Sequence, residues 1–235
     1  ILGSILEQAV KDDIIPKNYM KNIDRPKQVK VRHMVTLSVD EVKNFLSNIS
    51  NVEHHALFKL AFATGMRRSE LLGLRWSDID FKKSTISISQ TALKIGSTAV
   101  ISNTTKTTSS KRIIAIDTET LQELMKHKTV IDKRRIKTMN WINNNLVFPG
   151  IKGAPRCPDE VSKLCKKYAN LIGKPSFTMH GTRHTHATLL IENGANMKAI
   201  QERLGHASFQ ETMDTYSHVT PKMEDDIVER ISKIF

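Results

Sequence analysis

The chain has 235 residues, of which 39% are hydrophobic and 26% are charged, so it can bury a sizeable core and has the composition of an ordinary globular protein. Its 36 Lys and Arg residues outnumber its 24 Asp and Glu residues, and the formal charge of +12 indicates a polyanionic partner, nucleic acid ahead of an anionic membrane. No apolar run approaches the roughly 18 residues that a membrane span requires, which argues against a transmembrane protein.

The first predicted element is an amphipathic helix over residues 2–13, whose apolar residues recur at helical spacing from Leu2 to Val10. A single helix of this length is marginal by itself, so we expect it to belong to a domain of which this chain holds only the end. The chain also begins without Met, as expected of a fragment. Residues 22–36 are polar and basic and contain proline, which favours an extended linker.

Two helices are predicted after the linker. Ser38 and Glu41 match the capping box that opens a helix. The stretch "HHALFKLAFATG" predicts the next helix, with Gly65 as its C-cap. The stretch "RSELLGL" continues the helical pattern towards Trp76.

Period-two alternation predicts strands in the middle of the chain, at "STISISQ", "AVIS" and "RIIAID". The polar stretch "NTTKTTSSK" between the last two favours a hairpin tip. Further helices are predicted over residues 118–137, 158–171, 181–193, 196–204 and 221–233. The sequence therefore predicts an α+β fold that is mainly helical, with one small three-stranded antiparallel sheet.

The two cysteines, Cys157 and Cys165, are eight residues apart and match neither a zinc pattern nor a disulfide framework. The first residues also lack the basic flank and the cleavage pattern of a signal peptide. Both observations indicate a reduced, cytoplasmic setting.

The stretch "TMHGTRHTHATLL" gathers three histidines and an arginine before an apolar run. His180 and His184 have the i, i+4 spacing of a helical zinc site. However, the Glu of that motif is missing, and no third ligand is near in the sequence. We also expect His180 to precede the helix. The sequence therefore predicts no metal site. For His184 and His186 the alternative is a polar helix position or a hydrogen-bonded core histidine.

A phosphate-binding interpretation finds partners elsewhere in the chain. Arg67 follows a helix-ending glycine, and guanidinium groups bind phosphate oxygens with two hydrogen bonds. Taken alone, Arg67 is more simply explained as a surface charge. His206 follows a second helix-ending glycine, and Tyr216 stands ten residues further on among polar residues. The alternative for Tyr216 is a half-buried packing residue.

Five stretches, in this order, resemble the signature segments of the tyrosine recombinases, the phage-integrase family: "TGMRRSELLGLRWSDID", "TKTTSSKRIIAI", "HGTRHTHATLLIENG", "LGH" and "DTYSHV". The resemblance covers about residues 36–220 and is greatest to integrases of temperate phages and integrative elements of low-GC Gram-positive bacteria. It implies a catalytic domain over residues 37–235, which includes a C-terminal tail helix. A basic linker over residues 22–36 precedes that domain, and residues 1–21 are the expected last helix of a truncated core-binding domain.

Matched motif by motif, the resemblance implies six catalytic residues: Arg67, Lys106, His180, Arg183, His206 and Tyr216. Glu70 is the expected structural partner of Arg67. Lys111 lies on the same predicted hairpin as Lys106 and is the alternative for the catalytic lysine. The family resemblance implies neither a metal nor a cofactor.

The implied reaction is site-specific DNA strand exchange. Tyr216 attacks the scissile phosphate, forms a 3′-phosphotyrosine and releases a 5′-hydroxyl. A phenol has a pKa of about 10, so attack at neutral pH needs a base, for which His180 is the candidate. Arg67 and Arg183, with His206 as a hydrogen-bond donor, stabilise the charge on the phosphate. Lys106 protonates the leaving oxygen, and no ATP is needed because one ester replaces another.

The implied partner is double-stranded DNA at attachment sites, bound by a homotetramer in the synapse and by a monomer before it. A directionality factor and association with the nucleoid are also implied. Lys27, Lys30 and Arg32 in the linker, with Lys111, are expected to contact the DNA backbone. For the linker residues a solvated charge run is the alternative.

Two other functions use the same features. A type IB topoisomerase would relax supercoils with similar chemistry, and a DNA-binding regulator would have lost catalysis. The complete set of six residues argues against the regulator. The tail "VTPKMEDDIVERISKIF" is amphipathic and is expected to dock either on a neighbouring protomer or on its own domain.

Overall fold

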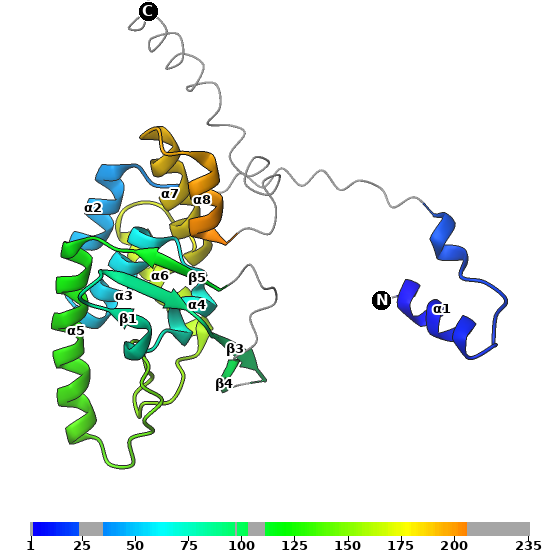
Figure 1. Ribbon diagram of the computed structural model, residues 1–235, viewed down its shortest axis with the longest axis horizontal. Helices are drawn as coiled ribbons and strands as arrows, with labels where there is room; N and C mark the ends of the chain where they lie inside the picture. Colours follow the sequence, from blue (N-terminus) through cyan, green and yellow to red (C-terminus); the bar gives the residue numbers. More distant parts are fainter. Residues whose placement is uncertain (1, 24–34, 97, 103–110, 206–235) are drawn as a thin grey trace, which may run out of the picture. The chain divides into compact units, whose positions relative to one another are not determined.

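The computed structural model describes residues 2–23, 35–96, 98–102 and 111–205 (Figure 1). The chain divides into two compact units, Ile1–His33 and Met34–Phe235. No described helix is long and apolar enough to cross a membrane.

The described part of the second unit is built from seven α-helices and two small sheets. Its helices are α2 (Val39–Ser47), α3 (Val52–Thr64), α4 (Arg68–Gly73), α5 (Thr118–Lys137), α6 (Pro158–Leu171), α7 (Met179–Glu192) and α8 (Met197–Leu204). The predicted capping box opens α2, because Ser38 N–H donates to Glu41 Oε2 at 2.9 Å and Glu41 N–H donates to Ser38 Oγ at 3.3 Å. Gly65 ends α3 with a φ of +64°, which confirms the predicted C-cap.

Helix α3 runs through the middle of the unit and packs against α2, α5 and α7 (Figure 1). It is buried on most sides, and its Phe58 ring meets Phe45 of α2 edge-on at 5.1 Å. Phe62, one turn later, stacks on Phe177, which lies just before α7. This core fixes the carboxyl end of α3 against α7.

The strands form two separate antiparallel sheets. In the first, β2 (Thr85–Ile88) lies between β1 (Ile79–Asp80) and β5 (Arg112–Ala115), with Ile86 paired to Ile114. In the second, β3 (Thr91–Ile95) pairs with β4 (Thr98–Ser102).

The predicted three-stranded sheet therefore exists, but one predicted member is wrong. The stretch "AVIS" lies in β4, outside that sheet, and the two-residue strand β1 takes its place. Among the described residues β4 and β5 pair with different strands, so they are not the two arms of one hairpin. The chain forms an additional strand, β3, directly after β2, where the Gln90 side chain donates to Gly73 O at 2.6 Å. Because β4 pairs with β3, it does not join the sheet of β2. The segment 103–110 lies outside the described residues.

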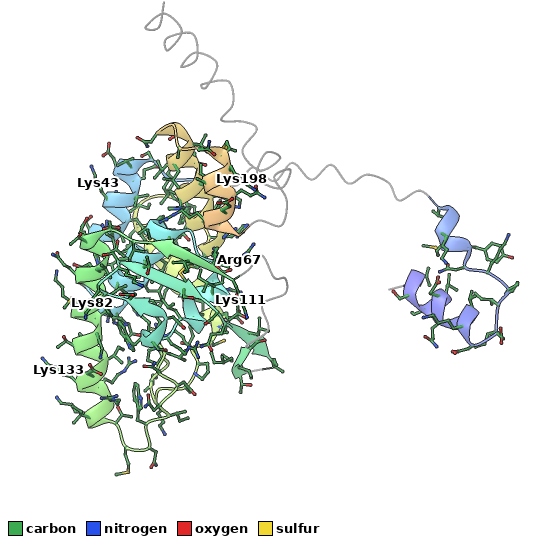
Figure 2. The ribbon with its side chains drawn as sticks, viewed as in Figure 1. Lys43, Arg67, Lys82, Lys111, Lys133 and Lys198 are labelled. Atoms are coloured by element: carbon green, nitrogen blue, oxygen red, sulfur yellow. The ribbon has the colours of Figure 1, made fainter. Side chains whose placement is uncertain are left out.

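Exposed lysines are spread over the surface of this unit (Figure 2). Lys43 lies on α2, Lys82 follows β1, Lys133 lies on α5 and Lys198 on α8. Exposed positive charge in the described part of this unit is therefore found on several separate elements.

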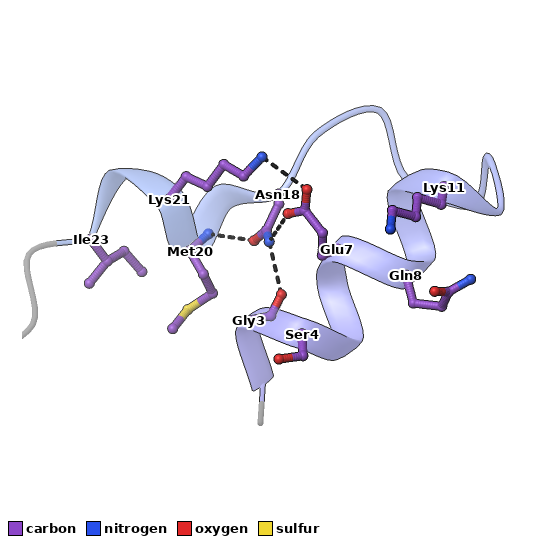
Figure 3. A pocket seen from close by; sticks show the side chains of 9 residues that line it. All are labelled: Gly3, Ser4, Glu7, Gln8, Lys11, Asn18, Met20, Lys21 and Ile23. Atoms are coloured by element: carbon purple, nitrogen blue, oxygen red, sulfur yellow. Dashed lines mark hydrogen bonds and ion pairs between the residues drawn. The ribbon is translucent and has the colours of Figure 1, made fainter. Parts of the chain in front are cut away.

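The first unit contains α1 (Leu2–Lys11) and the 3-10 helix η1 (Tyr19–Asn22). Helix α1 confirms the first predicted helix and ends two residues earlier than expected. Asn18 joins the two elements, since its Nδ2 donates to Gly3 O at 3.0 Å and to Glu7 Oε2 at 2.9 Å (Figure 3). A polar pocket of about 640 Å³ lies between them. No residue of α1 is buried, and Leu2 and Ile5 are 58% and 57% exposed, so the described residues leave part of its apolar face uncovered.

Candidate active site

A pocket of about 390 Å³ lies between segments that are far apart in the sequence. It is lined by the turn after α3, by the start of α4, by one residue of α6 and by the start of α7: Met66, Arg67, Arg68, Ser69, Ser162, Thr178, Met179, His180 and Arg183. Three of the six residues that the family resemblance implied, Arg67, His180 and Arg183, therefore lie in one pocket.

Arg67 lies between two helices in extended conformation, with φ −65° and ψ 148°. The turn that delivers it depends on Gly65, where a Cβ atom would lie 2.7 Å from the His186 ring of α7. This close contact, together with the positive φ, leaves room for glycine only. The backbone at the end of α3 therefore lies directly on α7.

Glu70 is almost fully buried and holds Arg67 in place. Its Oε2 accepts from the Arg67 backbone N–H at 2.8 Å, and its Oε1 accepts from Arg67 Nη1 at 2.9 Å. Burial alone would raise the pKa of the Glu70 carboxyl, but the hydrogen bonds and charges of Arg112 and Arg67 outweigh burial and lower this pKa below its usual value. Glu70 is therefore ionised at neutral pH, as expected of a structural partner of Arg67.

His180 lies in the first turn of α7, which begins at Met179 because the Thr178 side chain caps it by accepting from Gly181 N–H. The expectation that His180 precedes the helix is therefore wrong. Its ring lies 4.4 Å from the His184 ring, nearly perpendicular to it. In the described part of the chain, no group of three His, Cys, Asp or Glu residues is arranged to hold a metal ion.

The pKa of His180 is lowered, first by desolvation and then by the positive charges of Arg183 and Arg67. A lowered pKa keeps the imidazole neutral at neutral pH. His180 is therefore able to accept a proton there, which suits a general base.

Arg183 is 2% exposed and is oriented by two backbone carbonyl groups. Its Nη1 donates to Gly65 O at 2.9 Å, and its Nη2 donates to Leu204 O at 2.9 Å. It therefore joins the end of α3 to the end of α8.

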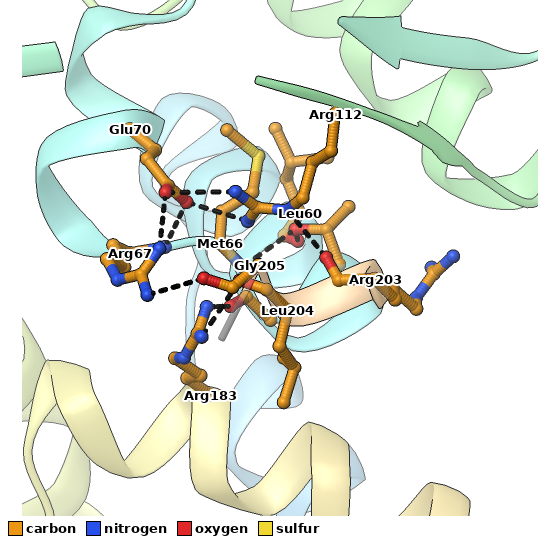
Figure 4. A network of polar contacts seen from close by, with 11 residues as sticks. Leu60, Met66, Arg67, Glu70, Arg112, Arg183, Arg203, Leu204 and Gly205 are labelled. Atoms are coloured by element: carbon orange, nitrogen blue, oxygen red, sulfur yellow. Dashed lines mark hydrogen bonds and ion pairs between the residues drawn. The ribbon is translucent and has the colours of Figure 1, made fainter. Parts of the chain in front are cut away.

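The carboxyl end of α8 is the point where three arginines meet (Figure 4). Arg112 Nε donates to Arg203 O at 2.6 Å, Arg183 Nη2 to Leu204 O, and Arg67 Nη2 to Gly205 O at 3.0 Å. The last carbonyl groups of a helix have no partner within the helix and carry its negative dipole end. Three successive carbonyl oxygens thus orient arginines from three other parts of the chain, immediately before His206.

The two later histidines of the same stretch lie in the interior. His186 Nδ1 lies 2.8 Å from Phe62 O, and Arg203 Nε donates to His186 Nε2 at 3.0 Å, so the interpretation of His186 as a hydrogen-bonded core histidine is confirmed. Burial, followed by the charge of Arg203, lowers the pKa of His186 to about 4. His184 is 5% exposed.

The sequence analysis missed two residues that help to build this site, Arg112 and Arg203. Arg112 bonds both oxygens of Glu70, and Arg203 Nη2 donates to Ala63 O and Ala115 O. Strand alternation contained a signal for Arg112, because it stands two residues before Ile114 and therefore on the same, buried face of β5. A buried arginine requires an anionic partner, and that requirement pointed to a carboxylate such as Glu70.

The remaining expected site residues are distributed as follows. Lys111 is exposed next to Arg112 at the start of β5 (Figure 2). Of the other tyrosines, Tyr19 is 58% exposed in the first unit, and Tyr168 is 5% exposed with its hydroxyl 2.9 Å from His54 Nδ1. Outside the described residues lie Lys27, Lys30, Arg32, Lys106, His206, Tyr216 and the predicted helix over residues 221–233.

Residues 36–223 match the model of the phage integrase family, and the chain belongs to this family. It is 31% identical to the tyrosine recombinase XerC-like protein of Caldanaerobacter subterraneus over 212 residues, which are 85% of this chain and 54% of that protein. It is 30% identical to the integrase of Staphylococcus phage L54a, with 97% of this chain and 68% of that protein covered. The ICEBs1 integrase of Bacillus subtilis is 27% identical, and the match covers 99% of this chain and 63% of that protein. The chain thus spans 54% to 68% of the length of these three relatives.

The fold is that of solved recombinases. The Tn1549 transposon integrase in complex with transposon right end DNA is 26% identical, with a TM-score of 0.73 over 98% of this chain and 76% of that one. The XerA recombinase, at 24% identity, has the same fold with a TM-score of 0.64 and covers 92% of this chain and 70% of that chain.

Proposed function

We propose that this chain is the catalytic part of a site-specific DNA recombinase that cleaves and rejoins strands through a 3′-phosphotyrosine on Tyr216. The observation that carries the proposal is the pocket in which Arg67, His180 and Arg183 meet, two fixed positive charges beside a histidine of lowered pKa. That combination suits a phosphodiester, whose transition state gathers negative charge while a nucleophile loses a proton.

Each residue has a distinct task in this reaction. Arg67 and Arg183 bind the non-bridging phosphate oxygens, and His206 donates a further hydrogen bond. His180 takes the proton of the Tyr216 phenol, whose ordinary pKa is about 10. Lys106 gives a proton to the departing 5′-oxygen. The phosphotyrosine conserves the ester, so a 5′-hydroxyl of a second strand reverses the step and no ATP is required.

The proposed substrate is duplex DNA carrying attachment sites. The relatives named above are recombinases and integrases, and one solved integrase holds transposon right end DNA, which favours strand exchange over topoisomerase-like relaxation. A homotetramer assembles in the synapse from monomers, and a directionality factor selects the direction of exchange. Lys27, Lys30, Arg32 and Lys111 contact the DNA backbone.

The proposed domain division follows the same resemblance. Residues 1–21 end a core-binding domain, residues 22–36 form the linker, and residues 37–235 form the catalytic domain and its tail. The division of the chain into two compact units, Ile1–His33 and Met34–Phe235, supports a boundary within the proposed linker.

A strand-transfer assay tests the function. The full chain is incubated with nicked duplexes from a randomised library and then with a labelled single strand that ends in a 5′-hydroxyl, in EDTA and without ATP. A recombinase joins the labelled strand to cleaved DNA, and the hybrid strands appear on a denaturing gel. Sequencing the hybrids identifies the preferred site, because every sequence in the library competes for cleavage.

The matched controls are two phenylalanine substitutions. Tyr216→Phe should abolish hybrid strands and retain DNA binding, whereas Tyr168→Phe should leave both unchanged in the folded fraction, because Tyr168 is a core residue. Hybrid strands formed equally well by Tyr216→Phe would rule out the proposed nucleophile. Cleaved ends that never join would indicate a nuclease.

A further inference from the structure

Arg112 occupies a central position between the elements that form the pocket. Its side chain is 7% exposed at the start of β5. Its Nη1 and Nη2 donate to Oε1 and Oε2 of Glu70 at 3.0 and 2.9 Å, and its Nε donates to Arg203 O at 2.6 Å. One guanidinium thus joins β5 to α4 and to the last turn of α8 (Figure 4).

The Glu70 carboxylate is shared between two arginines. Each of its oxygens accepts one hydrogen bond from Arg67 and one from Arg112. A bidentate contact fixes the plane of a carboxylate as well as its position. Arg112 therefore sets the orientation of the group that orients Arg67.

Arg112 also packs against the backbone of Gly205, which is a second group that holds Arg67. Gly205 has a φ of +68°, and a Cβ atom there would lie 3.0 Å from Arg112 Nη1 and 3.2 Å from its Cδ. The oxygen of the same Gly205 accepts from Arg67 Nη2. Arg112 therefore acts on Arg67 through two routes, the carboxylate of Glu70 and the backbone of Gly205.

The charges give a second reason for the arrangement. Without Arg112, the formal charges of Glu70 and Arg67 would sum to zero, and the attraction of Arg67 for a phosphate would be weaker. With Arg112 on the same carboxylate, the three groups sum to one positive charge. Arg112 thus offsets the negative charge that is needed to hold Arg67 and leaves the site cationic.

We propose that Arg112 is a positioning residue for strand cleavage: it fixes Glu70 and Gly205 and offsets the charge of Glu70, so that Arg67 meets the phosphate in a set orientation with its charge effective. This inference rests on the proposed function and deepens it. Arg112 acts through Arg67 and does not contact the DNA.

The test compares single-turnover cleavage of a nicked duplex by the full chain and its variants, together with DNA affinity and the unfolding midpoint. Arg112→Gln should slow cleavage by the bound complex by about 100-fold, because misplacement of a group that contacts the phosphate has effects of this size. DNA affinity should change little, because many other charges bind the backbone.

Two further variants separate charge from position. Arg112→Lys keeps a positive charge beside Glu70, so it should fold and bind DNA, yet cleave slowly because it lacks the bidentate contact. Adding Glu70→Gln to Arg112→Gln removes the uncompensated carboxylate, and cleavage should recover at least in part. A role limited to stability predicts no such recovery in the rate per folded molecule.

Arg156→Gln is the matched control. Arg156 is also a buried arginine, and it is ion-paired with the buried Glu53 at the amino end of α3, whereas the pocket lies at the carboxyl end. It should lower the unfolding midpoint and leave cleavage by the folded fraction unchanged. If Arg112→Gln and Arg156→Gln affect cleavage only in proportion to the folded fraction, or if Arg112→Lys cleaves at the unaltered rate, the inference is wrong. If the unaltered chain forms no covalent adduct on any duplex, the proposed function fails and the inference fails with it.

Discussion

Arg67 and Arg183 occupy different environments in the same pocket. Arg67 is 36% exposed and held by an ionised carboxylate, whereas Arg183 is 2% exposed and held by backbone carbonyl groups. These two guanidinium groups lie beside His180, whose pKa is lowered first by desolvation and then by their positive charges. At the residue scale the site thus separates the two groups that we propose to stabilise charge from the group that we propose to accept a proton.

The proposed roles predict which variants regain their cleavage rate on a substrate with a better leaving group. Lys106→Ala should slow cleavage of ordinary DNA, and a substrate with sulfur at the 5′-bridging position should largely restore the rate, because a thiolate leaves without a proton. Arg67→Ala and Arg183→Ala should lose roughly 100- to 1000-fold and stay slow on both substrates, since charge on the non-bridging oxygens remains uncompensated.

Paired rate measurements on oxygen and sulfur substrates check this prediction. Equal recovery of all three variants would contradict the assignment of roles. If Lys111→Ala shows the sulfur rescue and Lys106→Ala is mild, the catalytic lysine is Lys111 and the chemistry is unchanged.

At the scale of the elements, the site is formed by helix ends. The carboxyl ends of α3 and α8 and the amino end of α7 supply the turn before Arg67, the carbonyl groups that orient the arginines, and His180. Helix ends suit this use because their terminal backbone groups have no partners within the helix. Gly65 and Gly205, which end α3 and α8 with a positive φ, allow these ends to approach closely.

Gly205→Ala should therefore lower the free energy of unfolding more than Gly173→Ala does. Gly173 has nearly the same φ, +69° against +68°, but a Cβ atom there would meet nothing within 4 Å. Gly173→Ala should cost about 1 kcal/mol of unfolding free energy, the conformational penalty alone. Gly205→Ala should cost more, because Arg112 has to move, and it should also slow cleavage.

Chemical denaturation and single-turnover cleavage of both variants provide the measurement. Equal losses of stability with no effect of Gly205→Ala on cleavage would show that the contact with Arg112 is unimportant.

The elements that local signals specify were predictable from the sequence, and their pairings were not. The bounds of α5 and α6 match the prediction, because periodicity and Pro158 mark them locally. Strand alternation located β2, β4 and β5, but the partner of each strand depends on tertiary contacts such as Ile86 with Ile114. In the same way the motifs pointed to Arg67, His180 and Arg183. Strand alternation placed Arg112 on a buried face, but its pairing with Glu70, 42 residues away, depends on the tertiary fold.

At the scale of the whole molecule, folding assembles the pocket from distant parts of the chain. The bond from Arg67 to Gly205 spans 138 residues, and that from Arg183 to Gly65 spans 118. An unfolded chain therefore has no such site, and the proposed phosphate-binding pocket exists only when α3, α7 and α8 are packed together. The formal charge of +12 complements the proposed pocket, because an excess of positive charge attracts a polyanion such as the proposed DNA substrate without reading its sequence.

The most direct test of the central claim is to identify the residue that carries DNA after cleavage. The full chain is trapped on a nicked duplex, the adduct is digested with nuclease and protease, and the modified peptide is sequenced by mass spectrometry. The account predicts a nucleotide joined through its 3′-phosphate to Tyr216 and no modification in the Tyr216→Phe variant. A nucleotide on Tyr19, on Tyr168 or on a serine, or one joined through its 5′-phosphate, would contradict it.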